Sequence, residues 1–325
     1  MSELVLGLET SCDETAAAVI TREGEVLSNV ISSQAELHAR YGGVVPEVAS
    51  RRHLELVEPV VSEALSEAGV ALGDVDAVGV TQGPGLVGAL LVGLSYAKGL
   101  CWGSGRRLVP VDHLQGHVAS LFLGPDPLEP PFLCLLASGG HTLLGLAHEH
   151  ASFEVVGGTL DDAAGEAFDK GARLLGLGYP GGPALDRLAV EGDPAAYAFP
   201  IARVDGLDFS FSGVKTALLY AARELSEAEL DEARADLAAS YQRAIVNALL
   251  RRIEQAVEET GMKTVAVVGG VAANSALRAG LEALGARAAP LALCTDNGAM
   301  IASAARYAPD VGKADYLAVD AYPSR

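Results

Sequence analysis

Apolar segments alternate along the chain with short polar turns, and one arrangement of segments occurs twice. Residues 4–20 contain two apolar runs separated by the turn TSCDET, and residues 131–149 contain two more separated by SGGHT. Apolar runs of this length between turn residues predict buried strands. Each half of the chain is therefore expected to contain a strand–turn–strand unit.

A second arrangement is also repeated. Residues 75–100 read as a strand, a glycine turn and a helix, and so do residues 263–284. The same order of elements in both halves predicts an internal duplication, with two similar α/β lobes that face one another across a central cleft. The opposed turns could hold a nucleotide from both sides through backbone N–H groups.

The duplication gives expected domain limits. We assign residues 1–112 and 297–325 to an N-terminal lobe and residues 113–296 to a C-terminal lobe, and the Pro-rich stretch 124–131 marks the boundary region. The last helix, at 297–307, is expected to return to the first lobe.

The C-terminal lobe also carries a predicted helical insertion. Ser226 and Glu229 form a capping-box pattern that opens a long amphipathic helix, and this helix is expected to stop at Gly261.

Charge restricts how the chain can bind nucleic acid. The formal net charge is −19, which argues against a broad electrostatic grip on a polyanion, so any nucleic-acid site must be a local patch or be supplied by a partner. Arg40, Arg51, Arg52 and His53 cluster in sequence and are the predicted patch. The alternative is that these arginines pair with surface carboxylates.

Other features bear on location. The four cysteines form no C-x-x-C pair, so a disulfide framework or a thiolate zinc site is not expected. The N-terminus has no basic region typical of a secretory signal. The apolar run at 86–94 is too short to span a bilayer, and Lys98 follows it. These features predict a reduced, cytoplasmic protein without a membrane anchor.

A pair of histidines suggests a metal site. His113 and His117 are four residues apart, which on a helix places both imidazoles on one face. Leu114 stands where a zinc protease would carry its glutamate base, and Gln115 cannot take up a proton at neutral pH. The spacing alone equally suits two unrelated histidines, and a third ligand must come from elsewhere.

Nucleotide motifs are incomplete. Residues 83–88 match G-x-G-x-x-G, but Pro84 removes a backbone donor and the match lies late in its domain, so a dinucleotide site is only an alternative. No P-loop pattern occurs.

The SGGHT turn could bind a phosphate or an oxyanion through N–H groups, or be a plain hairpin. The acidic segment 161–170 could be a site or a solvated helix start, and Asp296 could be a ligand or a helix cap.

Taken together, the motifs resemble one family over essentially the whole chain. The segments that carry the resemblance are LGLETSCDETAAAV, GGVVPEVASRRHLE, TQGPGLVGALLVGLSYAKGL, HLQGH, ASGGHT, DDAAGEAFDK, GYPGGP, DFSFSGVKTA, GGVAAN and CTDNGAM. They occur in the same order as in the TsaD family of tRNA adenosine threonylcarbamoyltransferases, formerly labelled O-sialoglycoprotein endopeptidases. The resemblance implies the duplicated fold of the actin, sugar-kinase and heat-shock ATPase (ASKHA) superfamily.

The resemblance also implies site residues. His113, His117 and Asp296 match the family's metal ligands, and two His with one carboxylate suit Fe(II) first and Zn second. One departure is Gln115, where many members have Glu. The positions matching the family's substrate and adenylate contacts are Leu136, Ala137, Ser138, Gly139, Gly140, Asp169, Gly182, Asp186 and Asn274. Asp13 and Glu14, in the first turn, are candidates for proton transfer or orientation of the amine.

The implied reaction joins threonylcarbamoyl, donated by threonylcarbamoyl-AMP, to N6 of adenosine 37 in tRNAs that read codons beginning with A. AMP leaves, and the bound nucleotide is an adenylate or ATP. The implied partners are tRNA, a paralogous TsaB-like subunit and a TsaE-like ATPase. The alternatives on the same fold are an ATP-dependent kinase, a small-molecule carbamoyltransferase and a non-catalytic nucleotide-binding subunit.

Overall fold

The computed structural model describes residues 3–323 and divides into two compact units. The first unit runs from the N-terminal end to Pro130 and includes Glu149–Phe153 and the segment from Thr295 onward, while the second comprises Pro131–His148 and Glu154–Cys294. The division falls in the Pro-rich stretch identified from the sequence. It also assigns residues 113–130 to the first unit, unlike the expected limit at 112/113.

The first unit contains five strands and five α-helices among the described residues. They are β1 (Leu4–Glu9), β2 (Glu14–Thr21), β3 (Val26–Ser33), α1 (Ala35–Ala39), α2 (Pro46–Glu67), β4 (Ala77–Gly83), α3 (Val87–Ser104), β5 (Arg107–Asp112), α4 (His113–Ala119) and α10 (Gly298–Ala305). The strand order is β3-β2-β1-β4-β5. The first three strands pair antiparallel, and β1, β4 and β5 pair parallel.

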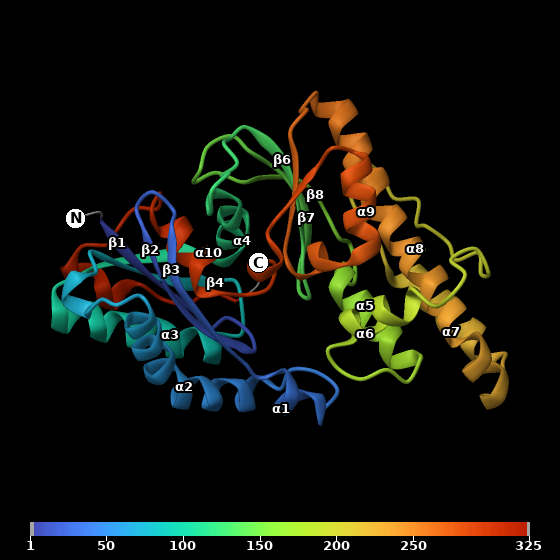
Figure 1. Ribbon diagram of the computed structural model, residues 1–325, viewed down its shortest axis with the longest axis horizontal. Helices are drawn as coiled ribbons and strands as arrows, with labels where there is room; N and C mark the ends of the chain where they lie inside the picture. Colours follow the sequence, from blue (N-terminus) through green and yellow to red (C-terminus); the bar gives the residue numbers. More distant parts are fainter. Residues whose placement is uncertain (1–2, 324–325) are drawn as a thin grey trace. The chain divides into compact units, whose positions relative to one another are not determined.

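The alternation of side chains along β1 explains how helices cover this sheet. Leu6 and Leu8 lie in the buried cluster that includes Ala64 of α2 and Leu94 of α3. A Cβ on Gly7 would point to the other face, against α10. Helix α10 packs on this face of the sheet (Figure 1). Helix α4 packs on α10, which is why the segment that begins at His113 belongs to the first unit.

Glycines allow α10 to approach the sheet closely. A Cβ on Gly7 would lie 2.2 Å from the carbonyl oxygen of Gly298, and a Cβ on Gly298 would lie 2.4 Å from the backbone of Ala17. No side chain fits at either position, because real Cβ contacts are never this short. The contact fixes the first turn of α10, and Asp296 lies two residues before that turn.

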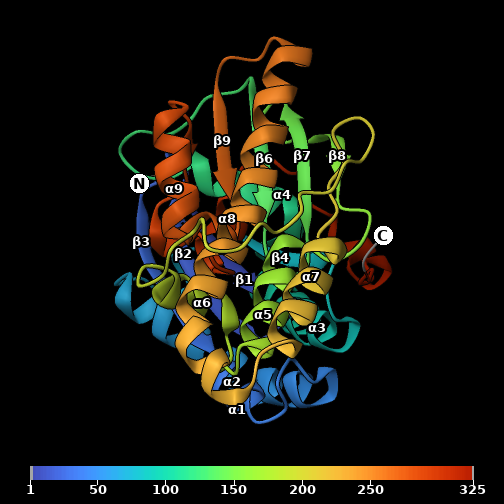
Figure 2. The ribbon, with the colours of Figure 1, turned by 90° about the vertical axis from the view of Figure 1, so that its right-hand side faces the viewer.

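The second unit has the same number of strands and α-helices in the described chain. They are β6 (Phe132–Ala137), β7 (Thr142–Ala147), β8 (Glu154–Gly158), α5 (Ala164–Leu174), α6 (Gly181–Ala189), α7 (Ser212–Arg223), α8 (Glu227–Thr260), β9 (Val265–Val268), α9 (Ser275–Ala283) and β10 (Arg287–Ala288). The strand order is β10-β9-β6-β7-β8. Helices α5, α6 and α7 each pack against the long helix α8 (Figure 2).

The two sheets have the same topology. In each sheet, the first three strands in sequence pair antiparallel. The fourth strand then pairs parallel with the first, and the fifth pairs parallel with the fourth. The predicted duplication is therefore confirmed at the level of strand order and direction.

The predicted insertion helix is confirmed as α8. The Ser226 hydroxyl accepts the Glu229 N–H and the Glu229 carboxylate accepts the Ser226 N–H, as in a capping box. Gly261 ends the helix in the left-handed conformation, with φ of 69°. Across residues 3–323, no helix combines the length and the apolar character needed to cross a bilayer.

Candidate functional site

The structure brings together His113, His117 and Asp296. Helix α4 begins at His113 because the Asp112 carboxylate caps it, accepting the N–H groups of Leu114 at 2.9 Å and Gln115 at 3.2 Å. One helical turn then separates the two imidazoles, whose ring centroids are 4.8 Å apart. Asp296 Oδ1 lies 3.7 Å from His113 Nε2 and 3.2 Å from His117 Nε2.

The donor set suits a divalent cation. One ligand atom from each residue lies within 4.8 Å of the others. His117 is 1% exposed, and among residues 3–323 neither of its ring nitrogens makes a hydrogen bond of good geometry; Nε2 only faces the Asp296 carboxylate at 3.2 Å. A buried imidazole without a hydrogen bond is costly, and a cation shared with Asp296 would satisfy Nε2. Two imidazoles and one carboxylate fit Fe(II) or Zn(II).

A buried carboxylate contacts the Nδ1 atom of His113, the ring nitrogen that does not face Asp296. Glu9, at the end of β1, is 0% exposed, and its Oε2 lies 3.0 Å from His113 Nδ1 and accepts the Thr81 hydroxyl at 2.6 Å. Its Oε1 accepts the Ser11 N–H. A carboxylate on Nδ1 keeps a proton there and leaves Nε2 as the atom that faces Asp296 and could bind a metal, as is typical of metal-binding histidines.

The charges around His113 affect its protonation. Burial alone would lower the pKa of His113, but the carboxylates of Asp296 and Glu9 outweigh burial and raise this pKa to about 9. Without a cation, His113 is therefore protonated near neutral pH. A metal that binds through Nε2 must displace that proton.

We expect Glu9→Gln to lower metal affinity about 10- to 100-fold, since loss of a hydrogen-bonding partner behind a metal-binding His has this effect. The neutral amide holds the Nδ1 proton less strongly and orients the ring less well. Metal content after dialysis at defined free metal concentrations measures the change. Glu154→Gln is the matched control, because Glu154 pairs with His148 at 3.0 Å outside this site. Equal metal affinity in Glu9→Gln and wild type would show that Glu9 does not support the site.

The first turn carries Cys12, Asp13 and Glu14. Burial raises the pKa of Glu14 to about 9, and the carboxylates of Asp296 and Asp13 add to the rise, while the Ser33 hydroxyl donates to Glu14 at 3.0 Å. Burial also raises the pKa of the Cys12 thiol well above its ordinary value. Cys12 is therefore held as a thiol and is a poor nucleophile.

The turn between β6 and β7 in the second unit leaves two N–H groups available. The Ser138 N–H donates to the His141 carbonyl at 2.8 Å, and the Ser138 hydroxyl accepts the His141 N–H at 3.1 Å, so Ser138 closes the turn. Gly139 and Gly140 are exposed, and in the described chain their N–H groups donate no hydrogen bond. Leu136 and Ala137 are buried inside β6, so their side chains do not face solvent.

Two further glycines bring neighbouring elements to this turn. Strand β6 pairs parallel with β9, so the carboxyl ends of both strands meet at one edge of the sheet. Gly269 has φ of 90°, and a Cβ there would lie 2.4 Å from the Ala137 carbonyl oxygen. A Cβ on Gly165, at the start of α5, would lie 2.5 Å from the Ser138 carbonyl oxygen. The carboxyl edge is where open α/β sheets bind ligands.

The remaining predicted adenylate contacts form two linked pairs in the second unit. Asp169 Oδ1 accepts the N–H groups of Gly181 at 2.8 Å and Gly182 at 3.1 Å, at the N-terminus of α6. One turn later, Asp186 Oδ1 accepts the side-chain amide of Asn274 at 3.1 Å. Helix α6 therefore positions both pairs.

Some residues at these positions were not anticipated from the sequence. Gln242 accepts the Asn274 amide at 2.7 Å, and Ser275 donates its hydroxyl to Asp186 at 2.7 Å. A serine directly after Asn274, at the start of a helix, was the available signal, because Asn and Ser are helix-capping residues.

In the acidic segment 161–170, a possible site from its sequence, Asp161 and Asp162 hold neighbouring elements in place. Asp161 accepts the N–H groups of Phe211 at 2.7 Å and Ser212 at 3.2 Å at the start of α7. Asp162 pairs with Lys170 at 2.7 Å and also with Lys215. These hydrogen bonds and ion pairs outweigh burial and lower the pKa of both carboxyls.

The predicted basic patch is wrong in part. His53 is 0% exposed and hydrogen-bonds to the Thr15 hydroxyl at 2.7 Å and the Cys12 carbonyl at 3.0 Å. Arg51 pairs with Glu47 at 2.8 Å, and Arg52 pairs with Glu55 at 2.6 Å. These two arginines therefore follow the alternative, pairing with surface carboxylates along α2. Gln115, at the position where the sequence departs from the family pattern, donates to the His150 carbonyl at 2.7 Å.

Comparison with known proteins gives matches over nearly the whole chain. The family model described as TsaD, tRNA N6-adenosine threonylcarbamoyltransferase, matches residues 25–303. A protein of that name from Symbiobacterium thermophilum is 54% identical over 98% of this chain and 96% of its own length. Another of that name, from Clostridium beijerinckii, is 51% identical over 99% of this chain and 97% of its own length.

Solved structures with low sequence identity share the fold. Component A of (R)-2-hydroxyglutaryl-CoA dehydratase from Acidaminococcus fermentans has a TM-score of 0.56 at 16% identity, covering 98% of this chain and 99% of that one. The full-length HypF structure in its phosphate- and nucleotide-bound form has a TM-score of 0.60 at 15% identity, covering 94% of this chain and 55% of that one. These similarities confirm the predicted fold class, a duplicated α/β fold of the ASKHA type.

Proposed function

This chain belongs to the TsaD family of tRNA N6-adenosine threonylcarbamoyltransferases, and we propose that its donor is threonylcarbamoyl-AMP and its acceptor is adenosine 37 of tRNAs that read codons beginning with A. The observation that carries the function is identity of about half of all residues, over nearly full length, to proteins of that name. The chain is thus a transferase that modifies tRNA, and the donor and the acceptor position are the proposal.

The reaction joins an activated carbonyl to a weak nucleophile. A bond forms between N6 of adenosine and the carbamoyl carbon, the bond from that carbon to the phosphate oxygen breaks, AMP leaves, and N6 gives up a proton. The lone pair on N6 is delocalised into the ring, whereas the donor is a mixed anhydride with a reactive carbonyl. The protein must therefore orient both reactants and stabilise developing negative charge.

The second unit is the proposed binding site for the adenylate part of the donor. The N–H groups of Gly139 and Gly140 in the β6–β7 turn would bind the phosphate. Asp186 and Asn274 would hydrogen-bond the ribose and adenine, with Asp169 and Gly182 fixing the N-terminus of α6. Leu136, Ala137 and Ser138 would shape the turn through their backbone.

In the first unit, His113, His117 and Asp296 would hold a divalent cation, Fe(II) in preference to Zn(II). When bound, the cation would supply Lewis-acid charge to a substrate oxygen. Glu9 would hold the proton on His113 Nδ1 so that Nε2 stays available. Asp13 and Glu14 remain candidates for proton transfer or for orienting the amine.

We infer partners from the family. A TsaB-like paralogous subunit and a TsaE-like ATPase would assemble with the chain, and the site of action would be the cytoplasm, where tRNA is modified. The high negative charge of this chain supports a partner that supplies part of the RNA-binding surface.

The function is tested by incubating the chain with threonylcarbamoyl-AMP and unmodified tRNA, with and without the partner subunits, followed by nucleoside analysis. Threonylcarbamoyladenosine at position 37, with AMP released in equal amount, is the expected result. A tRNA with position 37 changed from adenosine is the matched control. Turnover of ATP on a small hydroxylated substrate without tRNA would favour a kinase instead. A chain that shows no bound metal and no turnover would favour a non-catalytic subunit.

A further inference from the structure

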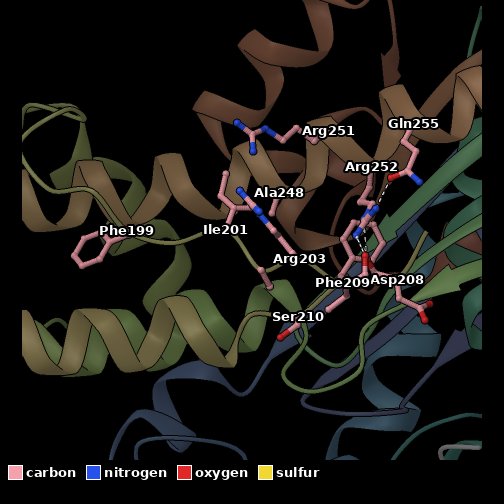
Figure 3. A pocket seen from close by; sticks show the side chains of 12 residues that line it. Phe199, Ile201, Arg203, Asp208, Phe209, Ser210, Ala248, Arg251, Arg252 and Gln255 are labelled. Atoms are coloured by element: carbon pink, nitrogen blue, oxygen red, sulfur yellow. Dashed lines mark hydrogen bonds between the residues drawn. The ribbon is translucent and has the colours of Figure 1, made fainter. Parts of the chain in front are cut away.

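The second unit contains a cavity of about 530 Å³ outside the donor-binding turn. It lies between helix α8 and the segment 199–210 that precedes α7, and Figure 3 shows the side chains that line it. Three of the lining residues are arginines, Arg203 from the segment and Arg251 and Arg252 from α8. A cavity of this size is large enough for a phosphate with its attached sugar.

Arg252 holds the wall of this cavity in place. Its guanidinium donates to three backbone carbonyls of the segment, Asp208 at 2.8 Å, Val204 at 2.7 Å and Gly206 at 2.6 Å. These bonds fix the segment against α8, so the cavity is formed before any ligand arrives. A preformed site lowers the entropy cost of binding.

Arg203 and Arg251 have no such partners. In the part of the chain that the structure describes, neither guanidinium takes part in a hydrogen bond or an ion pair, and both side chains are exposed. Asp208, the acidic residue of the lining, already accepts the Gly158 N–H through Oδ1 at 2.9 Å. Figure 3 shows Arg203 and Arg251 among the side chains at the cavity, while Arg252 points toward Asp208.

The pair stands on a chain that is acidic as a whole. The protein has 42 Asp and Glu against 23 Lys and Arg, so an exposed positive site is a local feature. Arg51 and Arg52 each pair with a carboxylate, within one turn of α2. Two neighbouring arginines without a carboxylate therefore indicate a local positive site for an anion from outside the chain.

We propose that this cavity binds the phosphate backbone of tRNA through Arg203 and Arg251. Guanidinium groups bind phosphate oxygens in a bidentate way, and such contacts position a nucleic acid without reading its sequence. The proposal rests on the proposed function, since it takes tRNA as the substrate. It replaces the patch predicted around Arg51 and Arg52.

The test compares two double variants with the same change in net charge. Arg203→Glu with Arg251→Glu should weaken tRNA binding at least about tenfold and lower the slope of log Kd against log salt concentration by about 2, because two phosphates are no longer neutralised. Arg51→Glu with Arg52→Glu is the matched control and should leave both quantities near wild type. Arg252 is left intact because it holds the fold of the segment.

Binding is measured with an unmodified tRNA transcript over a range of salt concentrations. Where the isolated chain binds too weakly to measure, the KM for tRNA in the transfer reaction with partner subunits replaces Kd. Circular dichroism and denaturant unfolding check that the variants are folded, and the affinity for AMP is measured separately. Arg203→Gln with Arg251→Gln should show a smaller loss in the same direction, without introducing carboxylates.

Three outcomes would overturn the proposal. Unchanged tRNA affinity and salt slope in the folded Arg203/Arg251 variant would exclude the cavity as an RNA site. Equal weakening in both double variants would show a general charge effect. Loss of AMP affinity with unchanged tRNA affinity would assign the cavity to a free nucleotide. Failure of the proposed function is distinct, since wild type itself would then form no modified nucleoside.

Discussion

Asp296→Ala is expected to lower bound metal and transfer activity together, each by at least about a hundredfold. Loss of a residue that hydrogen-bonds to a metal ligand already lowers metal affinity or activity 10- to 100-fold. Loss of a ligand itself should lower them more. Asp296 Oδ1 is the atom that faces both Nε2 atoms, at 3.2 and 3.7 Å. Without it, two imidazoles remain, one turn apart on α4, and they bind a divalent cation weakly.

The same result is expected for His113→Ala and His117→Ala. Metal is measured by mass spectrometry after dialysis, and transfer by nucleoside analysis. His148→Ala is the matched control, because His148 is an exposed histidine that pairs with Glu154 away from the three ligands. Asp296→Asn changes the charge with little change in volume and separates loss of metal from loss of fold. Full metal content in folded Asp296→Ala would remove Asp296 from the ligand set.

Much of the fold is predictable because it is determined by short-range patterns. Apolar runs separated by polar turns indicate the strand–turn–strand unit in each half, and the capping pattern at Ser226 and Glu229 indicates the start of α8. The limit between the units was harder to place. Helix α4 follows directly after β5, and only its packing on α10, far along the chain, assigns it to the first unit.

The candidate site was predictable to the extent that its residues are close in sequence. The four-residue spacing of His113 and His117 indicates a shared helix face, whereas Asp296 was assigned through the family resemblance. Glu9 contacts His113 across 104 residues, and no local pattern reports such a contact. A single carboxylate at the end of an otherwise apolar strand was the available signal, since a buried charge needs a partner.

The surface arginines also show that only contacts between residues close in sequence can be predicted. Glu47 and Arg51 are four residues apart and Arg52 and Glu55 are three apart, so helical ion pairs could have been predicted from spacing alone. Arg203 and Arg251 come from a loop and a helix that only the tertiary fold brings together. Their proximity could not be predicted without the structure.

Gly139→Val is expected to weaken binding of the adenylate donor by about a hundredfold while leaving the fold intact. A Cβ at Gly139 would meet no protein atom within 4 Å, and the residue does not have the left-handed backbone that only glycine adopts readily. The valine side chain would instead occupy the space in front of the N–H groups of Gly139 and Gly140. Hydrogen bonds to a charged group contribute about 1.5–3 kcal/mol each, so losing two reduces affinity by about a hundredfold or more.

Titration calorimetry with AMP or a non-reactive donor analogue measures this effect, and denaturant unfolding measures stability. Gly103→Val on α3 is the matched control, because a Cβ there also meets no protein atom within 4 Å. Both variants should unfold within about 0.5 kcal/mol of wild type, as surface substitutions usually do. Only the first should lose donor affinity, since the second lies on a helix rather than in the turn. Donor affinity equal to wild type in folded Gly139→Val would mean that the phosphate is not held by this turn.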